Sequence, residues 1–159
     1  MQELYQRIKK AICEYMQLNV DACILTNAWG YRGFSCLHHC NAETLFCQEI
    51  ELCRELWDNH RTIPPKVAIN VDYNPNTLKE HLAFWDTTLE KIIVALGKCS
   101  SDYFNATGCQ NKIISNVLEC LWRDYKKVKM WHDRFAETDW LVHDMRVVDD
   151  LLYLKVHKD

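Results

Sequence analysis

Apolar side chains recur every three or four residues through most of this 159-residue chain, the spacing of amphipathic α-helices. The clearest case runs from Cys109 to about Phe135. At about 100° per residue, its apolar residues share one side of a helix, whereas its lysines and arginines take the other. The apolar side comprises Ile113, Val117, Cys120, Leu121, Val128, Trp131 and Phe135. The pattern therefore predicts one long amphipathic helix here.

Three earlier stretches show the same period and predict helices over residues 3–28, about 34–59 and about 77–98. Gly30 and Gly33 end the first of these helices and turn the chain, and Asn76 or Thr77 is suited to cap the third. The segment 99–108, rich in Ser, Asn, Thr and Gly, predicts a link into the fourth helix. An apolar segment within residues 139–156 predicts a short fifth helix.

The helical pattern stops between His60 and Pro75, where two proline-containing breakers flank an extended run over residues 67–71. Roughly 15 residues of extended chain span about 50 Å, whereas a helix of about 25 residues is only about 37 Å long. Such a connection can return along the whole length of a bundle and join two parallel helices. We therefore predict a single all-α domain over residues 1–159, a four-helix bundle with a long crossover between the second and third helices and a short C-terminal fifth helix.

The amino-acid composition argues against several classes of protein. Four Gly and three Pro provide too few turns for an all-β fold, and a net charge of −3 without a basic cluster makes nucleic-acid binding unlikely. The absence of a signal-peptide pattern and of a membrane-length apolar run leads us to expect a cytoplasmic protein with no membrane partner. Nine cysteines, an odd number, favour reduced and mostly buried thiols over a disulfide framework.

The candidate chemistry starts from Asp124, which falls in the middle of the apolar side of the fourth helix. A carboxylate facing a core requires a partner, a proton or a cation. Glu49 on the second helix is predicted to face inward as well, and Tyr15 holds the corresponding place on the first. Carboxylates on facing helices form metal sites in bundles, and their oxygen ligands suit iron or manganese. Alternatively, either acid accepts hydrogen bonds from Tyr15, a Trp indole or His38.

Several segments resemble the ferritin-like superfamily, which comprises ferritins and the DNA-protecting mini-ferritins. Residues 29–38, Trp-Gly-Tyr-Arg-Gly-Phe-Ser-Cys-Leu-His, look like the turn between the first two helices of mini-ferritins. Residues 82–86, Leu-Ala-Phe-Trp-Asp, are similar to the ferritin third helix, whose ligand glutamate would fall on Asp86. Residues 119–131 resemble the fourth helix, with Asp124 at a metal-site position, and residues 147–157 resemble the fifth helix of the 24-subunit ferritins.

This resemblance implies an iron-binding or iron-storing subunit of a homo-oligomer, with Glu49, Asp124 and Asp86 as metal ligands and Tyr15 beside the iron. The Glu-x-x-His motif of the family's second helix is absent, because Phe46 stands where the Glu would be. The di-metal centre is therefore expected to be altered or lost, ferroxidase activity is doubtful, and no catalytic residue is assigned. The alternative is a non-enzymatic structural or protein-interaction bundle without metal.

Overall fold

The computed structural model describes residues 1–69, 72–137 and 142–157, without the side chains of 135–137 and 142–144. These residues form α1 (Gln2–Ala28), α2 (Arg32–His60), α3 (Leu78–Thr107), α4 (Lys112–Glu137) and α5 (Val142–Val156), and contain no strand. The predicted all-α bundle with a short C-terminal helix is confirmed. Among the described residues, no helix has the length and apolar character needed to cross a membrane.

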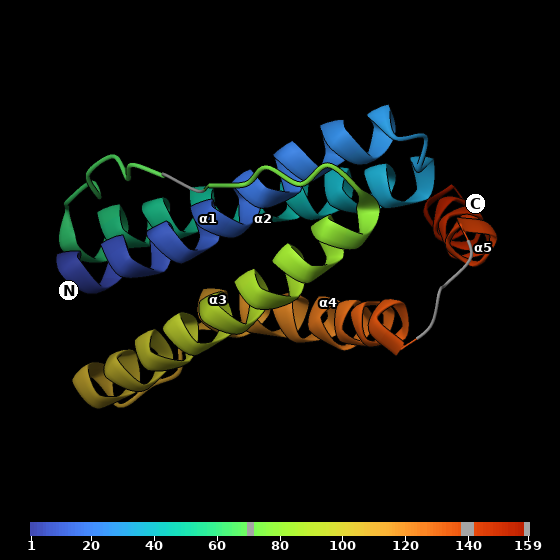
Figure 1. Cartoon of the computed structure of the whole chain (residues 1–159). Helices are drawn as coiled ribbons and strands as arrows, with labels where there is room; N and C mark the ends of the chain where they lie inside the picture. Colours follow the sequence, from blue (N-terminus) through green and yellow to red (C-terminus); the bar gives the residue numbers. More distant parts are fainter. Residues whose placement is uncertain (70–71, 138–141, 158–159) are drawn as a thin grey trace.

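The helices are arranged as two antiparallel hairpins (Figure 1). α1 packs against α2, α3 packs against α4, and α1 also contacts α3. The crossover between α2 and α3 runs back along the bundle, so these two helices point in the same direction, as predicted (Figure 1). Residues 70 and 71 of the extended run lie outside the described part of the chain.

Local chemistry sets the helix ends on either side of the crossover. α2 ends at His60, and the next residue, Arg61, has a left-handed φ of 49°. α3 begins at the cap Thr77, whose Oγ1 accepts a hydrogen bond from the Glu80 backbone N–H at 3.2 Å. The Glu80 carboxylate in turn accepts from the Asn76 backbone N–H at 2.7 Å. This reciprocal arrangement satisfies backbone donors that the first helical turn leaves unpaired.

α3 continues to Thr107 and is followed by Gly108, which has a φ of 73°. The prediction of a link over residues 99–108 is therefore wrong for most of that segment. Cys99 is buried in the core cluster, and Arg7 of α1 pairs with Asp102 at 2.7 Å. These tertiary contacts favour continued helix over the local preference of Ser and Asn for turns.

The core lies between the two hairpins and is filled by side chains from all the helices. The predicted apolar side of α4 is buried at each position that the structure describes, and Phe135 falls outside that set. The largest fully buried side chains are Trp85, Tyr5, Tyr15, Phe34, Ile8, Ile12, Leu18, Leu45, Leu52, Leu56, Leu82 and Leu89.

α5 packs on the beginning of α2, at the end of the bundle that contains the α1–α2 turn (Figure 1). The Phe34 backbone N–H donates to Asp149 Oδ1 at 2.9 Å, so a side chain from α5 caps α2. Arg146 donates to the Gly30 carbonyl, and its guanidinium lies 4.2 Å from the centre of the Tyr31 ring. The contact is close, because a Cβ on Gly33 would lie 1.8 Å from the Asp149 carbonyl oxygen.

Candidate functional site

Asp124 lies inside the bundle with its side chain 2% exposed, as its sequence position predicts. The Tyr15 hydroxyl donates to Asp124 Oδ2 at 2.6 Å, and Asn41 Nδ2 donates to the same oxygen at 2.9 Å. Arg123 Nε lies 3.8 Å from the other carboxylate oxygen, Oδ1. The carboxylate is thus held by donors from α1 and α2, which compensate for part of the cost of burying it.

Tyr15 connects this carboxylate to α3. Its hydroxyl donates to Asp124 and accepts a hydrogen bond from Trp85 Nε1 at 3.0 Å. Its backbone carbonyl accepts from Asn19 Nδ2 at 2.8 Å, one helical turn further along α1. The side chains of Tyr15 and Asn19 are fully buried, so these hydrogen bonds satisfy polar groups that have no access to water.

A pair of buried histidines continues the network. His38 Nδ1 lies 2.7 Å from Asn19 Oδ1, and His38 Nε2 lies 2.9 Å from His81 Nε2. Asn19 Nδ2 is already used as a donor, so Oδ1 is the acceptor and His38 Nδ1 carries the proton. A neutral His38 then accepts at Nε2, and His81 must donate from its own Nε2.

The crossover contributes the last hydrogen bond of this series, from Tyr73 to His81. His81 Nδ1 is the remaining acceptor, and the Tyr73 hydroxyl lies 2.8 Å from it as the donor. At the inner end, Asn41 Nδ2 donates to both Asn19 Oδ1, at 3.2 Å, and Asp124. We call this hydrogen-bonded set the core network; it consists of Tyr15, Asn19, His38, Asn41, Tyr73, His81, Trp85 and Asp124.

Burial shifts the proton affinities in this network. Desolvation lowers the pKa of His81 to about 3, and desolvation together with the charge of His81 lowers the pKa of His38. Both imidazoles are therefore neutral at pH 7. Burial raises the pKa of Asp124, against the hydrogen bonds from Tyr15 and Asn41, which lower it. Burial, followed by the charge of Asp124, raises the pKa of Tyr15 well above its usual value.

Glu49 does not join this network, so the prediction that it faces the core beside Asp124 is wrong. Its side chain is only partly buried and lines a pocket on the outside of α2. Glu49 follows Asn41 by eight residues, a rise of about 12 Å along the helix. Burial, followed by the charge of Glu49, raises the pKa of the Cys13 thiol to about 12, which places this carboxylate beside α1.

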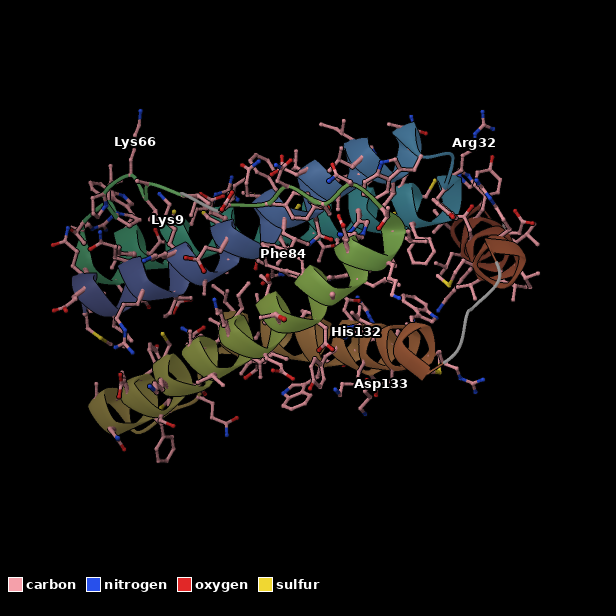
Figure 2. The ribbon with its side chains drawn as sticks, viewed as in Figure 1. Lys9, Arg32, Lys66, Phe84, His132 and Asp133 are labelled. Atoms are coloured by element: carbon pink, nitrogen blue, oxygen red, sulfur yellow. The ribbon has the colours of Figure 1, made fainter. Side chains whose placement is uncertain are left out.

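Asp86, the ligand position on α3 that the resemblance implies, is buried at 5% exposure. Its Oδ2 lies 2.7 Å from His132 Nδ1 and 3.9 Å from Lys129 Nζ, both on α4. Figure 2 shows His132 on α4 below α3. Asp86 Oδ1 is buried and has no hydrogen-bond partner among the described residues.

These placements do not fit a di-metal centre. Within residues 1–69, 72–137 and 142–157, no three His, Cys, Asp or Glu side chains are grouped so that they could hold a metal ion. Asp124 uses Oδ2 for two donors, and Asp86 bonds to His132 instead of facing Asp124's partners. All nine cysteines are free thiols, but only Cys13, Cys99 and Cys120 are buried, so the expectation of mostly buried thiols is wrong.

No functional role was predicted from the sequence for Asn19, Asn41, Tyr73 or His81. The signal for the helical residues was present, because each follows or precedes a core residue by three or four positions. Asn19 follows Tyr15 by four, and His81 precedes Trp85 by four. Any polar residue in an apolar row of a helix requires a buried partner, as Asp124 does. Tyr73 lies in the crossover, where no helical period could indicate its direction.

A pocket of about 480 Å³ lies on the outer side of α2 and is covered at one end by the start of the crossover. Its lining is mostly apolar and includes exposed aromatic side chains. The residues are Phe46, Glu49, Ile50, Cys53, Arg54, Trp57, Asp58 and Ile63. An apolar hollow of this kind on the surface is typical of an interaction site.

No protein-family model matches this chain, and no curated protein matches it.

Proposed function

We propose that this chain is a non-enzymatic, self-associating subunit built on a ferritin-like bundle, in which the core network takes the place of a di-metal centre. The observation that carries the proposal is the saturation of Asp124 Oδ2 by Tyr15 and Asn41. A metal ion bound at Oδ2 would have to displace both hydrogen bonds. Their loss would leave two buried donors unpaired, at a cost of about 1–3 kcal/mol each.

The core network supports a role in specifying how the helices pack. It draws side chains from four helices, such as Asn19 on α1, Asn41 on α2, His81 on α3 and Asp124 on α4. Buried polar networks that are satisfied in one arrangement penalise every other arrangement, in which the same groups lack partners. In this proposal the network fixes the bundle's register.

Exposed apolar side chains support self-association. Phe46 and Trp57 on α2 are 54% and 46% exposed, and Ile63 of the crossover is 72% exposed. Val20 and Ile24 on α1 are exposed as well. Apolar surface of this extent favours an interface. Nine free thiols fit a cytoplasmic location, where cysteines remain reduced.

Asp86 gives specific support to the alternative, an iron-binding or iron-storing subunit. Its buried Oδ1 has no hydrogen-bond partner among the described residues, and a buried carboxylate oxygen is a good ligand for a hard cation. His132, whose Nδ1 bonds the other oxygen, stands beside it. This alternative requires further ligands from another copy of the chain or from water.

Metal content and molecular mass, measured on the same purified protein, separate the two functions. We expect an oligomer that contains far less than one iron per chain, and no change in metal content in Asp124→Asn. The exposed crossover residue Asp72 provides the matched control, Asp72→Asn. If the purified protein is a monomer, the proposed self-association is wrong. One or more irons per chain, retained in Asp72→Asn and lost in Asp124→Asn or Asp86→Asn, would establish the metal site instead.

A further inference from the structure

One half of a complementary pair of surfaces is the pocket on α2, which we call the α2 groove. Phe46, Ile50, Cys53 and Trp57 repeat at intervals of four, three and four residues and form its floor. Ile63 of the crossover stands at one end. At about 100° per residue, Glu49 falls on one edge of this row and Arg54 on the opposite edge. The groove is thus an apolar strip with an acidic side and a basic side.

The other half is the outer face of α5, which we call the α5 ridge. It consists of Val147, Leu151 and Leu154, which are 46%, 62% and 63% exposed and share the same spacing of four and three. Asp150 falls on one edge of this row and Lys155 on the other, both exposed. The ridge therefore repeats the pattern of the groove: an apolar strip with an acidic edge and a basic edge.

We propose that the α5 ridge of a second copy of this chain docks in the α2 groove, an inference that rests on the self-association proposed above. Charge sets the direction of docking. With the two helices parallel, the acidic edge of each faces the basic edge of the other. Glu49 then meets Lys155 of the partner subunit, and Arg54 meets Asp150 of the partner subunit. Antiparallel docking would place acid against acid and base against base, which is unfavourable.

Shape selects the ridge as the occupant over a second groove. A concave apolar surface is filled by a convex one, whereas two facing grooves would leave a void between them. A lone helix such as α5, packed on the bundle through its inner face, presents a convex outer face. The pocket's volume of about 480 Å³ offers room for side chains of the size of leucine.

The positions of the two surfaces make the assembly head-to-tail. α5 lies at the end of the bundle marked by Arg32 at the start of α2 (Figure 2), and the groove extends from the middle of α2 to the opposite end. Each copy therefore offers a ridge at one end and a groove at the other. Contacts between two different surfaces generate a ring if the rotation closes and an open filament if it does not.

Two single variants and their mixture test this interface. Trp57→Asp disables the groove and Leu151→Asp disables the ridge; both side chains are largely exposed, so folding is expected to survive and is checked by thermal melting. Mass measurement should show each variant alone as a monomer. Mixed one to one, they should form a dimer that does not extend, because Leu151→Asp keeps a working groove and Trp57→Asp keeps a working ridge.

A charge exchange tests the same contact without altering its apolar strip. Arg54→Asp and Asp150→Arg should each weaken assembly by about tenfold or more, and the double variant should restore it, since the exchanged pair has opposite charges again. Lys79→Asp, on the exposed side of α3, is the control and should assemble like the wild type.

The outcomes separate this inference from the proposed function. A wild-type monomer would overturn both. A wild-type oligomer that Leu151→Asp leaves intact would overturn only the ridge-in-groove contact, and would indicate a groove that meets another groove or a different protein. Two monomeric variants that fail to pair, or a charge exchange without rescue, would overturn it too.

Discussion

His38 Nε2 and His81 Nε2 lie 2.9 Å apart inside the bundle, so a single proton occupies the space between them. Asn19 fixes the proton of His38 on its other nitrogen, and the shared proton therefore belongs to His81. A second proton on His38 would place two N–H groups against each other. The geometry and the lack of solvent both oppose charging of this pair.

The histidine pair predicts that the protein loses stability on mild acidification. Unfolded histidine titrates at 6.5, whereas the folded pKa of His81 is about 3 and that of His38 is also lowered. The unfolded state therefore binds protons first as the pH falls below 6.5. His81 should therefore remove about 2 kcal/mol from the free energy of unfolding by pH 5, and His38 adds a loss in the same direction. Urea unfolding at pH 7, 6 and 5 measures this loss.

His81→Gln provides the control for this pH dependence. The variant has only one of the two buried histidines, so the slope of stability against pH between 6.5 and 5 should fall. Asp124 acts in the opposite direction, because its raised pKa makes its contribution decline as pH rises through the folded value. A slope unchanged in His81→Gln would show that the imidazoles are not the cause.

Asp124 should respond very differently to two substitutions of similar size, Asn and Leu. Asp124→Asn retains a carbonyl oxygen that can accept from Tyr15 and Asn41, so the free energy of unfolding should change by less than about 1 kcal/mol. Asp124→Leu leaves both donors unpaired and should lose about 2–4 kcal/mol. Equal losses from Asn and Leu would indicate that the carboxylate charge itself is required.

Gly33 should be intolerant of a methyl group because of its contact with α5. In Gly33→Ala the Cβ would lie 1.8 Å from the Asp149 carbonyl, which forces α5 to move and should cost about 1–3 kcal/mol. Hydrogen exchange should then accelerate in α5 before it does so in the rest of the bundle. Gly97→Ala is the matched control, since that Cβ meets open space in the middle of α3 and should stabilise by up to about 1 kcal/mol. Equal exchange in the two variants would contradict the role of the Gly33 contact.

The helical period was enough to predict the helices and the crossover, because each long helix buries one continuous apolar row. It failed at the end of α3, where the ion pair of Arg7 with Asp102 stabilises helix in a segment of turn-forming residues. Pairing between residues 95 positions apart leaves no trace in a local pattern.

The candidate site was only partly predictable, because helical positions show which polar residues are buried but not which side chains meet. Asp124 and Tyr15 were identified because a polar group in an apolar row requires a partner. Glu49 was misplaced because its helical angle lies near the edge of the buried face of α2, and a small rotation of the helix turns it outward. The two histidines bond across helices, and helical angles taken one helix at a time do not show which side chains meet.

The cap that Asp149 places on α2 ties the start of the second helix to a residue 115 positions later in the chain. During translation, the amide of Phe34 emerges from the ribosome long before its acceptor exists. At about 5–20 residues per second, the nascent chain waits roughly 6–23 s for that acceptor. Until then the first turn of α2 lacks this hydrogen bond, so the bundle can be completed only in the last stage of synthesis.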